Sequence, residues 1–322
     1  MNKLTNNYIS GLIQANGSIG INLHKTKNSL RLIPYFNITQ NIKNKDLILK
    51  IKHYFNDIGF IIINKSDNTI RYQVNQLNDL HHIIIPFLLR NDLRSNKHIK
   101  VIILKYIINI MIDKLHINNN SILLSLIILA NKITNNHNRY LNKEQQYIVN
   151  NQIYNKDILN IIEDMELSIK NYKPSNLDLD YINGLFDGKG SLSVSLNSNK
   201  DITLTYYIIQ DKNEMLLLNN IKSYFNNIGH IYNINNTSFR WETKSIVEFN
   251  KNILNKMITE DNYPLIKGYK IKHMINVLKY ISDNKDYKKN NDKIRYIISE
   301  LYNIIENKKG IRLDEYIKKL MK

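Results

Sequence analysis

The residues most able to do chemistry in this chain are polar side chains near the ends of two similar, glycine-bounded segments. Residues 9–17 read ISGLIQANG, and residues 182–190 read INGLFDGKG. The polar positions closest to the terminal glycines are Gln14, Asn16, Asp187 and Lys189. The chain contains no cysteine, which excludes disulfides, thiolate metal sites and cysteine nucleophiles.

These two segments belong to a duplication that runs through most of the chain. Residues 8–23 match residues 181–196, so that Gly11 corresponds to Gly184. Further on, the segment IKHYFNDIG corresponds to IKSYFNNIG, Arg71 corresponds to Arg240, and the first LKYI corresponds to the second. Because the same motifs recur in the same order with nearly constant spacing, the sequence predicts two copies of one structural unit.

Hydrophobic periodicity predicts an αββαββα order for each copy. A helix over residues 4–15 ends at Gly17, a residue suited to the left-handed conformation of a helix C-cap. A half-buried strand follows, and its apolar and polar residues alternate between two faces. A second helix over residues 46–58 is closed by Gly59, and strands are predicted near residues 60–65 and 70–75.

The alternation predicts which side chains face the core and which face outward. In the first copy, Ser18, Asn22 and His24 face outward, as do Arg31, Tyr35 and Asn37 on the next strand. In the second copy, the outward residues are Ser191, Ser193, Ser195 and Asn197, and later Arg240 and Glu242, opposite Phe239 and Trp241.

The segments 9–17 and 182–190 resemble the LAGLIDADG signature of homing endonucleases and RNA maturases, and the second is the nearer match. The resemblance implies an α+β fold, a pseudo-two-fold tandem of αββαββα domains whose two antiparallel four-stranded sheets form a saddle on nucleic acid. It also implies that the two motif helices pack side by side between the domains. Small residues four apart on each helix would permit that approach, and these domain-interface residues are Gly11, Ala15, Gly184 and Gly188.

In active nucleases of the family, the acidic residue just before the terminal glycine of each motif holds a divalent metal. In this chain those positions are Asn16 and Lys189, and neither is acidic. At roughly 4 Å and an effective dielectric constant near 20, each unit charge exchanged is worth about 4 kcal/mol, so a lysine strongly opposes a cation there. We therefore expect no catalytic residue, no metal and no cofactor. Lys189 could instead pair with a backbone phosphate.

Asp187 lies two positions before Lys189 and points to a different face of the helix. We interpret it as a capping or interface hydrogen-bonding residue rather than a metal ligand.

A set of basic and aromatic residues on outward strand positions, in hairpins or at the motif helix end is predicted to bind nucleic acid. The basic members are expected to contact phosphate, and the two tyrosines are expected to stack or to hydrogen-bond with nucleotides. The set comprises His24, Arg31, Tyr35, Arg71, Lys189, Lys200, Tyr207 and Arg240. The alternative is that exposed strand positions are polar in any protein.

The charge balance favours a polyanionic partner. The chain has 45 Lys and Arg against 28 Asp and Glu, a formal net charge of +17. An excess of that size creates a long-range positive field, although A/T-rich codon usage also inflates lysine. The over-use of Asn, Lys, Tyr and Ile is typical of an A/T-rich genome such as a fungal mitochondrial one. We expect no secretory signal and no membrane span, because the apolar runs at 101–112 and 122–133 are too short or too interrupted. The expected location is the mitochondrial matrix, with the gene in the organelle.

The repeat predicts four segments along the chain. Residues 1–115 form a first LAGLIDADG domain and residues 116–176 a helical insert, with a linker at 173–176. Residues 177–283 form the second domain, and residues 284–322 a basic loop and a helical C-terminal tail.

The preferred hypothesis is a nuclease-inactive protein that binds structured RNA as a monomer with internal pseudo-symmetry. It would act as a group I intron maturase or as a stable RNA-bound component of a ribonucleoprotein such as the mitochondrial ribosome, since neither task needs a hydrolytic centre. The alternative is a homing endonuclease that makes site-specific double-strand breaks in DNA, and DNA binding without cleavage stays open.

Overall fold

The chain divides into two compact units. A computed structural model describes residues 4–25, 30–91, 93–134, 140–305 and 311–321. The first unit is Asn16–Asn176, and the second unit is Met1–Ala15 together with Leu177–Lys322. Helix α1 (Asn6–Asn16) therefore groups, up to Ala15, with the second half of the sequence. The segment 116–176 falls in the first unit and the segment 284–322 in the second.

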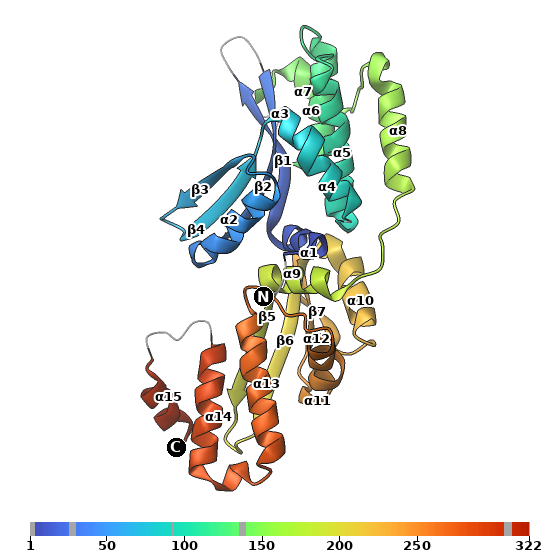
Figure 1. Ribbon diagram of the computed structural model, residues 1–322. Coiled ribbons are helices and arrows are strands. Elements are labelled where there is room, and N and C mark those ends of the chain that lie inside the picture. The colour runs from blue at the N-terminus through green and yellow to red at the C-terminus, as the bar shows by residue number, and fades with distance from the viewer. Residues whose placement is uncertain (1–3, 26–29, 92, 135–139, 306–310, 322) are drawn as a thin grey trace. The chain divides into compact units, whose positions relative to one another are not determined.

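The first unit holds a four-stranded antiparallel sheet in the order β1-β2-β4-β3. Its strands are β1 (Gly17–Lys25), β2 (Leu30–Asn41), β3 (Phe60–Asn64) and β4 (Thr69–Val74). Its helices are α2 (Lys45–Tyr54), α3 (Leu77–Asp79), α4 (Ile85–Arg90), α5 (Ser95–Ile112), α6 (Asn120–Ile133), α7 (Lys143–Asn150) and α8 (Leu159–Lys170), with short turns η1 (Ile42–Asn44), η2 (Leu80–Ile84) and η4 (Lys156–Ile158). Helices α5 and α6 pack against each other and against β1 (Figure 1).

The second unit repeats the same sheet, in the order β5-β6-β8-β7. Its strands are β5 (Gly190–Leu196), β6 (Ile202–Asp211), β7 (His230–Asn235) and β8 (Ser238–Thr243). Besides α1, its helices are α9 (Leu179–Lys189), α10 (Met215–Tyr224), α11 (Ile246–Glu248), α12 (Asn255–Thr259), α13 (Gly268–Asp283), α14 (Asn291–Ile304) and α15 (Leu313–Leu320), with η5 (Lys212–Glu214), η6 (Phe249–Leu254) and η7 (Tyr287–Lys289). Helices α13 and α14 lie side by side, and α15 packs on α14 (Figure 1).

These elements confirm the α+β class and the two four-stranded antiparallel sheets. The predicted alternation holds because one face of each sheet is buried against helices. Ile19, Ile21 and Leu23 are buried, while Ser18 and His24 are exposed. In the second unit the inward face carries Tyr206 and Trp241, and Trp241 stacks on Phe225 with ring centroids 5.6 Å apart.

Gly17 does not adopt the expected left-handed C-cap conformation, since β1 begins at that residue. The corresponding Gly190 has φ −101° and is also extended. Close packing explains Gly190, because a Cβ there would lie 2.2 Å from the Phe186 ring. Among the described residues, the glycines in the left-handed region are Gly59 and Gly229, with φ of +67° and +74°, where the chain turns into β3 and β7.

Two outward predictions were wrong about exposure. Glu242 and Asn37 lie on the outward faces of their strands, yet both are buried. Glu242 forms ion pairs with Arg240 and Lys244, which satisfy its buried charge. Within the described part of the chain, no helix is long and apolar enough to cross a membrane.

Candidate nucleic-acid interface

The motif helices α1 and α9 touch through their backbones within the second unit. A Cβ added at Gly11 would lie 1.9 Å from the carbonyl oxygen of Tyr181, and one added at Gly184 would lie 2.0 Å from that of Tyr8. Both distances are far below van der Waals contact, and both partners are main-chain atoms. Glycine is therefore required at both positions by the closeness of the helices. Ala15, by contrast, joins the hydrophobic core of the second unit.

Asp187 sits in the same helix pair and is fully engaged in hydrogen bonds. Its carboxylate accepts from the Tyr8 hydroxyl at 2.7 Å and from the backbone N–H groups of Ile266 and Lys267 at 2.8 Å each. Burial raises the pKa of Asp187, although these donors offset part of the rise. Burial likewise raises the pKa of Tyr8, which stays a neutral donor. The hydrogen-bonding interpretation of Asp187 matches this geometry.

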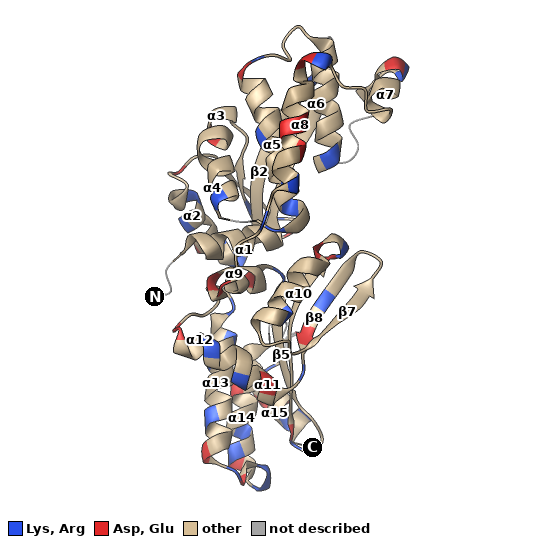
Figure 2. Ribbon diagram, turned by 90° about the vertical axis from the view of Figure 1, so that its right-hand side faces the viewer, with Lys and Arg blue, Asp and Glu red and all other residues tan. Residues whose placement is uncertain are grey.

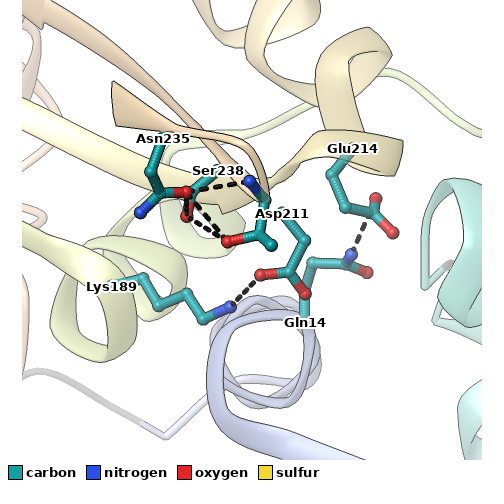
Figure 3. Close-up of polar contacts among 7 residues, drawn as sticks. Gln14, Lys189, Asp211, Glu214, Asn235 and Ser238 are labelled. Carbon is teal, nitrogen blue, oxygen red and sulfur yellow. Dashed lines mark hydrogen bonds and ion pairs between the residues drawn. The ribbon is translucent and has the colours of Figure 1, made fainter. Parts of the chain in front are cut away.

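Lys189, at the last position of α9, forms an ion pair with an acid that the sequence did not single out. Its Nζ lies 3.2 Å from Oδ1 of Asp211, the last residue of β6, and Figure 3 shows the two side chains pointing toward each other. The first motif carries two side-chain amides, Gln14 and Asn16. The Gln14 amide donates to the buried carboxylate of Glu214 at 3.2 Å (Figure 3). Asn16 is half-buried at the end of α1. No cluster of three or more His, Asp or Glu side chains arranged to hold a metal occurs among the residues described.

The predicted binding residues of the first unit all lie on the outward face of its sheet. His24 and Arg31 are directly opposite each other and exposed. Arg71 is exposed, and its Nε donates to the Thr39 hydroxyl at 3.3 Å. The Tyr35 side chain is less available to a ligand than expected, because it packs over Gly20. A Cβ added at Gly20 would lie 2.4 Å from the Tyr35 hydroxyl.

Arg31 also borders a hollow with further basic groups. The pocket has a volume of about 730 Å³, and Lys114 and His116 contribute to its wall. Burial lowers the pKa of His116, against a backbone contact with Ile110 that raises it. The imidazole is therefore expected to be neutral at pH 7.

The second unit holds a denser arrangement on its outward face. The Arg240 guanidinium carbon lies 5.1 Å from the centre of the Tyr207 ring, and its Nη2 lies 2.7 Å from Glu242 Oε2. The other carboxylate oxygen of Glu242 is 3.0 Å from the Lys244 ammonium. Arg240 is thus held between an aromatic face and a buried carboxylate, with its side chain still one-third exposed.

Lys200 lies in the hairpin between β5 and β6, in the left-handed region with φ +63°. Its ammonium donates to the carbonyl of Lys288 at 3.3 Å, and its own carbonyl accepts from the Tyr287 hydroxyl. These contacts tie the hairpin to η7. Lys200 is therefore less available to a phosphate than Arg31 or Arg71.

The positive charge of the chain lies mainly outside the sheets. The eight strands in the described part of the chain contain four Lys and Arg (Lys25, Arg31, Arg71, Arg240) and two acids (Asp211, Glu242). They therefore account for two of the seventeen net positive charges. Figure 2 shows Lys and Arg gathered on helices such as α13 and α14, with one blue and one red band on β8 and none on β7. The strands offer hydroxyl, amide and ring groups, while the basic field comes from the helices and loops.

Sequence reasoning missed the exposed rings and apolar side chains of the edge strands. Phe60 and Ile62 on β3, and Tyr232 on β7, are about two-fifths exposed. Ile62 lies directly opposite Arg71, and Tyr232 directly opposite Arg240. The duplication already aligned the two arginines, so pairing their strands by register would have found these neighbours.

Comparison with known proteins places the chain in a family. A family model described as LAGLIDADG endonuclease matches residues 9–108 and again residues 182–281. The chain therefore belongs to the LAGLIDADG endonuclease family. A relative from Neurospora crassa, described as probable intron-encoded endonuclease 2, is 25% identical over 279 residues, which cover 83% of this chain. The match spans 56% of that relative's length.

Solved structures share the fold over nearly the whole chain. The LAGLIDADG homing endonuclease I-GzeII in complex with its DNA target superposes with a TM-score of 0.74 at 22% identity, covering 94% of this chain and 99% of that one. I-LtrWI bound to target DNA gives a TM-score of 0.74 at 24% identity, covering 94% and 98%. At these identities the likeness establishes the tandem fold.

The contacts of each basic residue predict how much it contributes to the salt dependence of nucleic-acid binding. Arg71→Ala should flatten the slope of log affinity against log salt by about 0.7 to 0.9, the value for one phosphate contact. Lys200→Ala should change the slope much less, since its ammonium already donates to a carbonyl. Fluorescence anisotropy of a labelled nucleic acid over a salt series measures both. Reversing the charge of Arg31, Arg71, Lys189, Lys200 and Arg240 together with no change in affinity or slope would refute the binding face.

Proposed function

We propose that this protein is a nuclease-inactive member of its family that binds structured RNA, as a maturase of group I introns. The observation that carries the proposal is the pairing of Lys189 with Asp211 at 3.2 Å. The position that would supply one metal carboxylate instead supplies a cation, and that cation engages a neighbouring acid. Asn16, at the other position, is uncharged.

The rest of the site supports binding without hydrolysis. Splicing assistance needs a rigid, shaped surface and a positive field, and RNA recognition relies on hydroxyl and backbone contacts and on stacking. The sheets supply Ser, Thr, Asn and aromatic side chains on their outward faces, and the net charge of +17 supplies the field. A stable RNA-bound component of a mitochondrial ribonucleoprotein would use the same surface. We propose the mitochondrial matrix as its location, with the gene in the organelle, because heavy use of Asn, Lys, Tyr and Ile is typical of an A/T-rich genome.

The second candidate function is site-specific cleavage of DNA. It is favoured by the solved relatives I-GzeII and I-LtrWI, which are bound to DNA targets, and by the endonuclease name of the Neurospora crassa relative. Two acids, Asp211 and Glu214, also remain close to the ends of the motif helices in the second unit (Figure 3). However, each is already bonded, to Lys189 and to Gln14 respectively.

The test is whether the protein leaves DNA uncleaved in the presence of a divalent metal. Purified protein should leave supercoiled and linear DNA intact with Mg²⁺ or Mn²⁺, while binding a group I intron transcript in a salt-dependent way. Cleavage at defined sites that depends on the metal would overturn the proposal. The variant carrying Asn16→Asp and Lys189→Asp is the matched control. It should bind Mg²⁺ more tightly than the parent by calorimetry, because two carboxylates replace an amide and a cation.

A further inference from the structure

Strands β6, β7 and β8 bring together four outward side chains around Arg240. Tyr232 and Arg240 are register partners, as are His230 and Glu242. Tyr207 lies directly opposite Glu242 on the other side, in β6. Directly opposite residues on one face of an antiparallel pair have Cβ atoms about 5 Å apart. Arg240 therefore has an aromatic neighbour on each adjacent strand.

The orientation of Arg240 is fixed by its surroundings. Glu242 is only 2% exposed although it lies on the outward face, and its two oxygens contact Arg240 and Lys244 at 2.7 and 3.0 Å. Tyr207 faces the guanidinium with 5.1 Å between the ring centre and Cζ. A guanidinium carries five N–H donors, and among the described contacts the ion pair engages Nη2. Nε is buried without a hydrogen-bond partner among the described residues and the side chain is one-third exposed, so the donors left for a ligand are the outer N–H groups of Nη1 and Nη2.

Tyr232 is the exposed partner of this arrangement. It is 43% exposed, and its ring lies 6.1 Å from that of His230. A planar ring exposed beside a fixed guanidinium offers a stacking surface with hydrogen-bond donors at its edge. A nucleobase can use both only when it is unpaired, because the faces of a paired base are covered by its stacked neighbours.

We propose that Tyr232 and Arg240 form a binding site for one unpaired guanine, in which the base stacks on Tyr232 and accepts hydrogen bonds from Arg240 through O6 and N7. Guanine is the base that presents two adjacent acceptors to an arginine fork. Glu242 is a positioning residue, since it acts through Arg240. This inference rests on the proposed RNA-binding function.

The first unit provides the matched comparison. Its equivalent arginine is Arg71, directly opposite Ile62 instead of an aromatic residue. Gln73 stands where the second unit has Glu242, and Arg71 is exposed and bonded to Thr39. Arg71 therefore resembles a phosphate contact, and Arg240 resembles a base reader. The two units should differ in what their arginines recognise.

The experiment uses the full chain and short fluorescein-labelled RNAs of uridines with one central variable base. By anisotropy, the guanosine probe should bind about tenfold more tightly than the adenosine probe. Inosine, which keeps O6 and N7, should bind like guanosine, whereas 7-deazaguanosine should bind like adenosine. Equal affinity for guanosine, adenosine and 7-deazaguanosine, or tighter binding of the matched duplex, would overturn the site.

The variants separate stacking from base reading. Tyr232→Ala should weaken the affinity for the guanosine probe by about tenfold, and Tyr232→Phe should leave that affinity unchanged. Ile62→Ala, the control from the first unit, should leave the preference for guanosine intact. Glu242→Gln should keep the affinity for the adenosine probe but reduce the preference for guanosine, a change that loss of folding alone would not produce. Preference unchanged in both Tyr232→Ala and Glu242→Gln contradicts the assignment.

Failure of this inference and failure of the proposed function are distinguishable. If the protein binds the intron transcript and leaves DNA intact but shows no guanosine preference, the guanine site alone is wrong. If it cleaves DNA with Mg²⁺, the proposed function is wrong whatever the short RNAs show.

Discussion

A leucine at Gly184 is expected to destabilise the second unit by about 3 kcal/mol or more. The Cβ alone would lie 2.0 Å from the carbonyl oxygen of Tyr8 and 2.8 Å from the backbone nitrogen of Leu12. Main-chain atoms in a helix cannot move aside as a flexible side chain can, so α1 and α9 would have to separate. Gly11→Leu should behave alike, since its Cβ would lie 1.9 Å from the carbonyl oxygen of Tyr181.

Chemical denaturation followed by circular dichroism measures this effect, and a third glycine provides the control. Gly268 begins α13, and a Cβ there would meet the Cβ of Tyr263 at 3.4 Å, an ordinary contact. Gly268→Ala should therefore be neutral or slightly stabilising. If Gly184→Leu and Gly11→Leu unfold at the same denaturant concentration as the parent, the close helix pair is wrong.

Much of the fold could be predicted from the sequence because it depends on patterns that survive in the chain. The alternation at Ile19, Ile21 and Leu23 follows directly from one buried sheet face. The small residues of the motifs indicated a close helix contact, and the structure places Gly11 and Gly184 at such a contact. These features depend on local patterns, and because the chain is duplicated, the sequence contains each pattern twice.

The ends of the elements and the pairing of charges were harder to predict. Gly17 was assigned a left-handed cap because glycine favours it, but glycine also permits extended backbone, and the strand begins there. Nothing local to Lys189 indicates that Asp211, the last residue of β6, would be its partner, since the contact depends on how β6 closes on α9. Tertiary contacts decide such pairs.

The distribution of charge could not be predicted from composition. The net charge of +17 indicated a polyanionic partner, yet the strands carry few charged groups, and Glu242 forms an ion pair with Arg240. Composition reports how much charge a chain has, and only the fold reports where it lies. On the proposed function, the helices and loops would attract the polyanion, and the strands would discriminate among its bases.

Removing the carboxylate of Asp187 is expected to cost about 3 kcal/mol or more of folding free energy. Asp187→Ala would leave the Tyr8 hydroxyl and the N–H groups of Ile266 and Lys267 without their acceptor in a site where Asp187 itself is only 3% exposed. A buried donor left unpaired costs about 1–3 kcal/mol. Tyr8→Phe removes only one of the three donors and should cost about 1 kcal/mol, so it serves as the graded control.

The pH dependence of the same variant series tests which influence dominates at Asp187. Burial raises its pKa in the folded protein, so its stabilising contribution is complete below the unfolded pKa and is lost as the pH rises through the folded pKa. Asp187→Asn cannot titrate there, and all other groups titrate in both proteins. The unfolding free energy of the parent minus that of Asp187→Asn, measured by urea unfolding, should therefore be larger at mildly acidic pH than at neutral pH. A difference that grows toward neutral pH would mean that the three donors outweigh burial and hold the carboxylate charged between the two motif helices.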